Sequence, residues 1–132
     1  MTWLDKELER GNSSVEMVVL YSLLLLLVLI AVQAGLYLHA KQVVRTSARE
    51  GVHATAQYDG TAADGEARTR RYLRQLGDRL VTVDDVHAFR SATRADVMVT
   101  ATVRGVLPWP GTTLRETSTA PVERFTPTRA RP

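Results

Sequence analysis

Cysteine is absent from this 132-residue sequence. Its absence excludes disulfide bonds, thiolate metal sites and a cysteine nucleophile. The histidines His39, His53 and His87 are far apart, and no acidic residue stands at a helical spacing that completes a metal site with them. We therefore expect no metal ion and no cofactor.

Aromatic residues are also scarce, at 6% of the chain, and the basic residues are not clustered. The net charge of +3 comes from 17 Lys and Arg against 14 Asp and Glu, with arginines scattered from Arg10 to Arg131. A nucleic-acid surface normally gathers its basic residues and adds stacking aromatics or a reading motif. The sequence therefore predicts no nucleic-acid binding.

The common sequence patterns of enzymes are missing as well. There is no G-x-S-x-G, Walker-type or GxGxxG segment in a credible context. Asp84 and Asp85 are adjacent, and adjacent side chains on a strand point to opposite faces, so these carboxylates do not converge on one proton or cation. We predict that the protein is not an enzyme and has no catalytic residue.

The sequence does contain one long apolar run, from Met17 to Leu38. Its 22 residues carry no charge, and a helix of that length spans about 33 Å, the thickness of the hydrocarbon core of a bilayer. The run predicts a transmembrane helix over residues 12–38, held in a lipid bilayer, after a leader over residues 1–11. A cleaved secretory signal is the alternative, because Val32-Gln-Ala34 resembles a cleavage site, although the run exceeds the usual length of ~7–15 residues.

After the apolar run, residues 39–57 continue in helical register and predict an amphipathic stalk. One side of the stalk is largely apolar and consists of Val44, Ala48, Val52 and Thr55. Another side, the basic stripe, repeats every four residues and consists of Lys41, Arg45, Arg49 and His53. The basic stripe is interpreted either as a solvated face near lipid phosphates or as a docking surface for a partner.

Residues 58–124 are predicted to form a small α+β domain. Tyr58-Asp-Gly60 breaks the helical pattern, and Thr61 is suited to cap a second helix that ends near Gly77. Gly65 weakens the first turns of this helix. Its predicted apolar face consists of Ala63, Ala67, Leu73, Leu76 and Leu80, whereas Arg68, Arg70, Arg71 and Arg74 form a solvated surface.

Beyond Leu80 the apolar period changes from that of a helix to that of a strand. Two strands, over Val81 to Phe89 and Asp96 to Arg104, are joined by a turn at Ser91 to Arg94, and a third follows over Thr112 to Val122. Leu107 to Gly111 is a loop, and residues 125–132 form a disordered tail. The predicted fold is α+β: the long helix and its stalk, the second helix, and an antiparallel three-stranded sheet with one face covered by the second helix.

The N-terminal helix also carries features beyond those of a plain anchor. Ser13-Ser-Val-Glu16 matches the capping box S-x-x-E and predicts a helix start, with a capping contribution of about 1 kcal/mol. Ala31 and Gly35 form a small-x-x-x-small pair that lets another backbone approach closely, and Gln33 favours a hydrogen-bonding neighbour in the membrane. These residues predict a helix that packs against other helices.

Arg10-Gly11, Glu16, the apolar helix and then AKQVVRTSAREG, from Ala40 to Gly51, together resemble the TadE-like family. Its members are minor pilins, or pseudopilins, of tight-adherence (Tad) pilus systems, which are type IV-like. The resemblance implies that a prepilin peptidase cleaves between Gly11 and Asn12. It also implies that Glu16 sets the register between subunits by pairing with the N-terminal amine of a neighbour.

The resemblance further implies a location and partners. The protein would lie in the bacterial inner membrane with a cytoplasmic N-terminus and an extracytoplasmic C-terminal domain, among other pilus subunits and inner-membrane assembly proteins. Counting basic residues favours the opposite orientation, because Lys41, Arg45 and Arg49 outnumber Lys6 and Arg10; we keep the orientation of the family. The alternative function is a signal-anchored extracytoplasmic binding module with no pilus role.

Overall fold

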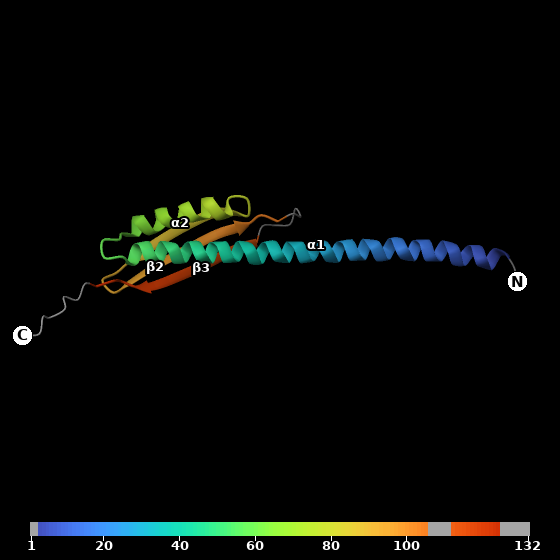
Figure 1. Cartoon of the computed structure of the whole chain (residues 1–132), viewed down its shortest axis with the longest axis horizontal. Helices are drawn as coiled ribbons and strands as arrows, with labels where there is room; N and C mark the ends of the chain where they lie inside the picture. Colours follow the sequence, from blue (N-terminus) through green and yellow to red (C-terminus); the bar gives the residue numbers. More distant parts are fainter. Residues whose placement is uncertain (1–2, 106–111, 125–132) are drawn as a thin grey trace, which may run out of the picture. The chain divides into compact units, whose positions relative to one another are not determined.

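The computed structural model describes residues 3–105 and 112–124. It has two helices and three strands in the described residues, in the predicted order, and confirms the α+β class. The elements are α1 (Trp3–Ala56), α2 (Ala62–Gly77), β1 (Val81–Arg90), β2 (Arg94–Val103) and β3 (Thr112–Pro121) (Figure 1). The chain divides into two compact units, Met1–Gly35 and Leu36–Pro132. The predicted loop at Leu107 to Gly111 and the predicted tail lie outside the described residues.

The first unit contains the N-terminal part of α1. This helix begins at Trp3, so Ser13 and Glu16 lie inside it rather than at its start. The predicted capping box at these residues is therefore wrong. Most residues of the leader, WLDKELER, have good helix propensity, and neither proline nor glycine interrupts them before Gly11, so the helix continues through the predicted start.

The second unit is built on an antiparallel sheet with the order β1-β2-β3. The helices α1 and α2 pack on one face of this sheet (Figure 1). On β2 every second side chain faces the helices and is buried, because side chains alternate along a strand. These buried residues are Ala95, Val97, Val99, Ala101 and Val103.

The segment predicted as a stalk forms part of this core. The expected burial of one side is confirmed: Val44, Ala48, Val52 and Thr55 are at most 2% exposed. Ala40, Val43 and Ala56 join the same hydrophobic cluster as the strands. Residues 39–56 of α1 therefore contribute a core face to the second unit, and the basic stripe lies on an exposed flank of the same segment.

The start of α2 agrees with the prediction at Thr61. The Thr61 hydroxyl accepts a hydrogen bond from the Asp64 amide at 3.1 Å, and the Asp64 carboxylate accepts one from the Thr61 amide at 3.0 Å. This reciprocal pair is a capping box, which satisfies two amides of the first turn. The helix ends at Gly77, also as predicted.

The predicted apolar face of α2 is largely wrong. Leu73 is buried, but Ala63, Ala67 and Leu76 are exposed. The buried residues are instead Gly65, Thr69, Leu73 and Gly77, which repeat every four residues. The small residues Gly65, Thr69 and Gly77 allow α2 to lie close to α1, a contact that apolar character alone does not indicate.

The hairpin and the third strand agree with the predictions. The Ser91 amide donates to the Arg94 carbonyl at 2.8 Å and closes the turn between β1 and β2. The register of this pair shifts between Val83 and Asp85, which marks a β-bulge in β1. The pairing of β2 with β3 runs from Arg94↔Pro121 to Val103↔Thr112 without a shift.

Candidate functional site

The apolar part of α1 exposes its side chains in the isolated chain. Ser14–Ala56 is the candidate span among the described residues: its most apolar stretch has a mean hydropathy of 2.8 and is 0% buried. By length and composition this segment suits a membrane anchor. The exposed apolar side chains require an apolar environment outside this chain, either lipid or neighbouring helices.

Glu16 is an exposed carboxylate near the start of this apolar surface. It is the only Asp, Glu, Lys or Arg between residues 11 and 40. Among the described residues no ion pair is formed by Glu16. A lone carboxylate on an apolar helix is costly to desolvate unless a cation meets it, so Glu16 fits a charge contact with another molecule.

The other sequence-predicted residues of α1 lie along the same helix. Gly11 and Asn12 are within its N-terminal part. Ala31 is exposed, Gln33 is half-buried, and a Cβ added at Gly35 would meet nothing within 4 Å. The Ala31 and Gly35 side of the helix is thus open to a neighbouring backbone.

The hydroxyl of Ser22, in the apolar part of α1, has a partner within its own helix. Its hydroxyl donates to the Val18 carbonyl at 2.8 Å. This bond within the helix satisfies the hydroxyl, so Ser22 does not require a partner on another helix.

The basic stripe lies on the part of α1 that belongs to the second unit. Lys41, Arg45, Arg49 and His53 are all exposed, as a solvated or docking face requires. The structure forms no ion pair with Arg45 or Arg49 among the described residues. Their charges are therefore available to an acidic partner.

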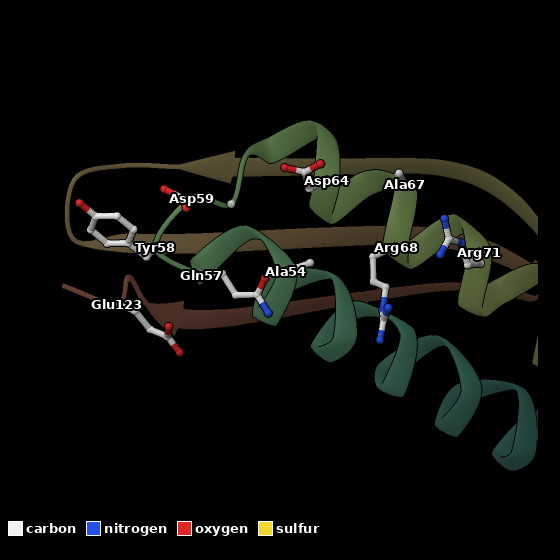
Figure 2. Close-up of a pocket in the computed structure, with 10 residues that line it drawn as sticks. Ala54, Gln57, Tyr58, Asp59, Asp64, Ala67, Arg68, Arg71 and Glu123 are labelled. Carbon is white, nitrogen blue, oxygen red and sulfur yellow. The ribbon is translucent and has the colours of Figure 1, made fainter. Parts of the chain in front are cut away.

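A shallow hollow of about 660 Å³ lies where α1 ends and α2 begins. Figure 2 shows Arg68 and Arg71 on α2 on one side, with Tyr58, Asp59 and Glu123 at the other end. Arg68 reaches Glu50 at 3.5 Å, and Asp64 is engaged in the capping box. Residues far apart in the sequence form this hollow, which is why sequence reasoning missed it.

One charged residue of the hollow, Asp64, has a shifted pKa. Hydrogen bonds from the Thr61 hydroxyl and the Thr61 amide lower the pKa of Asp64 below its usual value of 3.8. No group of three His, Cys, Asp or Glu that could hold a metal ion occurs in the described part of the chain. The arrangement offers mixed charges for surface contacts.

The sequence also did not indicate the role of Arg90. Its guanidinium donates to the Thr55 carbonyl, to the Gln57 carbonyl at 2.7 Å and to the Tyr58 carbonyl at 3.2 Å. The last carbonyls of a helix lack partners within the helix. Arg90 supplies donors to them and ties the end of α1 to β1.

Together these features define a class of protein: a long apolar N-terminal helix suited to membrane anchoring, continuous with a helix that packs on a small α+β unit. The family model for TadE-like proteins matches residues 11–53. The matched segment runs along α1 from Gly11 and includes Glu16 and the basic stripe, so this part of the chain is TadE-like. It points to a pilin-like protein associated with Tad pili. No curated protein and no solved structure matches the chain.

Proposed function

We propose that the chain is a single-pass, non-enzymatic minor pilin or pseudopilin of a bacterial Tad pilus assembly system. The observation that carries this proposal is the TadE-like match that begins at Gly11 and covers an apolar helix with a lone exposed carboxylate, Glu16. The helix is inserted in the inner membrane with its N-terminus in the cytoplasm. The C-terminal α+β unit lies outside.

In this proposal a prepilin peptidase removes the leader. The cut falls between Gly11 and Asn12, so Asn12 becomes the first residue of the mature chain. The cleavage creates a new ammonium group four residues before Glu16. The match to the family begins at the proposed cleavage point, at Gly11.

Glu16 then sets the axial position of the subunit. In an apolar environment a carboxylate and an ammonium are each costly alone and favourable when they meet. By the resemblance to pilins, the proposed partner of Glu16 is the N-terminal ammonium of a neighbouring subunit. Such a pair selects one register between helices more than it adds stability.

Helix packing completes the proposed assembly. Ala31 and Gly35 allow a neighbouring backbone to approach closely, and Gln33 lies on the same part of the helix. The partners in the membrane are other pilus or pseudopilin subunits and the inner-membrane assembly proteins. The lipid bilayer covers the apolar side chains that these contacts leave exposed.

The Glu16→Gln variant tests this function, because it keeps the size and polarity of the side chain and removes its charge. We expect normal membrane insertion and loss of cross-links to pilus subunits in cells. Glu7→Gln is a matched control, since Glu7 lies in the leader and would be absent from the mature subunit. If Glu16→Gln cross-links as the wild type does, the register role is wrong, and a signal-anchored binding module becomes the better account.

A further inference from the structure

The sheet of the second unit has two edges, β1 and β3, which differ in regularity and in the contacts of their outward backbone groups. The β1 edge is interrupted by the bulge between Val83 and Asp85. The carboxylate of Glu66, on α2, accepts a hydrogen bond from the Ala88 amide at 3.1 Å. Bulges and covering side chains are common ways to block a sheet edge against further strands.

Among the described residues, the β3 edge has neither device. All ten residues of β3 pair with β2 in one unbroken register. The Val122 amide donates to the Thr93 carbonyl at 3.1 Å, and hydrogen-bonded pairs alternate along an antiparallel ladder. The backbone N–H and C=O groups of the even-numbered residues of β3 therefore point toward β2. Those of the odd-numbered residues point away from the sheet. The outward amides belong to Thr113, Arg115, Thr117 and Thr119.

These four amides are open to a further strand. In the described part of the chain no backbone or side-chain acceptor reaches them. Threonine favours strands, and four of the ten residues of β3 are threonines. A regular edge of this kind is a template for strand addition.

The basic stripe lies beside this edge. Gly51 and Glu50 mark the flank of α1 that faces α2, because a Cβ at Gly51 would clash with Thr69 and Glu50 contacts Arg68. Successive stripe residues, one turn apart, lie on the other flank of α1. Since α2 packs against β1 on the same face of the sheet, the flank of α1 away from α2 is the one toward β3.

A hydrogen bond supports this placement of α1. The Glu123 amide, two residues after the end of β3, donates to the Ala56 carbonyl at 2.9 Å. The last turn of α1 is thereby held next to the end of β3. The open edge and the stripe thus lie on the same side of the second unit.

We propose that this surface binds an extended acidic segment of a partner protein, which adds to the sheet as a fourth strand beside β3. Its backbone pairs with the outward groups of β3, and its acidic side chains contact Arg45 and Arg49. This interaction goes beyond the proposed pilus function and does not depend on cleavage at Gly11.

The spacing of the charges fits an extended partner. Residues four apart on a helix are separated by about 6 Å along its axis, and alternate residues of a strand by about 6.7 Å. Two acidic residues at alternate positions of the segment therefore match the spacing of Arg45 and Arg49. Glu116 of β3 also faces the helices, so we expect a neutral residue opposite it.

A fluorescent peptide of sequence TETETSTETET, with blocked ends, is a direct probe. We expect saturable binding, measured by fluorescence anisotropy, to the full chain in lipid nanodiscs. The same peptide with lysine in place of glutamate should not bind. Absence of saturable binding, or equal binding of the two peptides, would overturn the proposal.

Paired charge reversals test the stripe. Arg45→Glu with Arg49→Glu should weaken binding of the peptide about ten-fold, because two exposed charge contacts are lost. Arg70→Glu with Arg74→Glu makes the same change in net charge on exposed residues of α2 and should leave binding within about two-fold. Equal weakening by the two pairs would show non-specific attraction and contradict the proposed surface.

Hydrogen exchange tests the fourth strand in the wild-type chain. Adding the peptide should slow exchange of the outward amides of Arg115, Thr117 and Thr119, while the inward amides of β3 are already protected by β2. Thr117→Pro removes one outward donor and should weaken binding about five-fold. Unchanged exchange of the three amides, or concentration-dependent protection without peptide, which would show a second copy on the edge, would contradict the proposal.

Discussion

Gly51 of α1 and Gly65 of α2 lie directly against each other. A Cβ added to either glycine would stand 2.9 Å from the carbonyl oxygen of the other. The Thr55 hydroxyl donates to the Gly51 carbonyl at 3.0 Å, and the Thr69 hydroxyl donates to the Gly65 carbonyl at 2.8 Å. Each helix thus presents the same Gly-x-x-x-Thr pattern, and the two backbones approach as closely as these small residues allow.

This contact predicts the effect of added methyl groups. Gly51→Ala and Gly65→Ala should each destabilise the second unit by about 1–3 kcal/mol, because the helices must move apart. Gly35→Ala is the matched control, since a Cβ there meets nothing within 4 Å. The measurement is the thermal midpoint of the sheet's circular dichroism in detergent. Equal midpoints for all three variants would contradict the close contact.

Arg90 should be important for the end of α1. Arg90→Met keeps the length of the side chain and leaves the carbonyls of Thr55 and Gln57 without their donor, so we expect a loss of about 1–3 kcal/mol. Arg94→Met provides a control. Arg94 pairs with Asp96, but the Arg94 side chain is 64% exposed, so the expected loss of stability is below about 1 kcal/mol. We expect faster amide hydrogen exchange in the last turn of α1 in the Arg90→Met variant and unchanged exchange there in the Arg94→Met variant.

The capping box predicts a pH dependence. The pKa of Asp64 is lowered in the folded state by its hydrogen bonds to Thr61. The Asp64 carboxylate of the unfolded chain therefore binds a proton more readily than that of the folded chain. The contribution of Asp64 to stability is present above its usual pKa of 3.8 and is lost as the pH falls through the lower pKa of the folded state. Asp64→Asn should flatten this part of the stability curve between pH 5 and about pH 2, whereas Asp59→Asn should not. A wild-type curve unchanged by Asp64→Asn would refute the assignment.

The regular parts of this fold could be predicted from the sequence. Val97 and Val99 share a face because the strand period alone decides which side chains point to the core. The sequence predicts Thr61 as a cap because capping depends on residues within one turn. The buried face of α2 was missed, since Gly65 and Thr69 are buried by Gly51 and Thr55, which belong to another helix.

The candidate functional residues divide in a similar way. Glu16 and the basic stripe could be found from the sequence, because a lone charge in an apolar run and a four-residue spacing are local patterns. Arg90 could not, since the carbonyls that it binds lie 32 to 35 residues away. The free edge of β3 depends on the order of the strands, which no single strand's sequence specifies.

The most direct test of the proposed pilin role is the mass of the mature N-terminus. The full-length chain would be expressed in a bacterium with an active Tad system, purified from the membrane, and its N-terminal peptide identified by mass spectrometry. We predict a mature chain that begins at Asn12. A chain that keeps Met1 or Thr2, or one that begins at Gly35 after a secretory cut, would contradict prepilin processing.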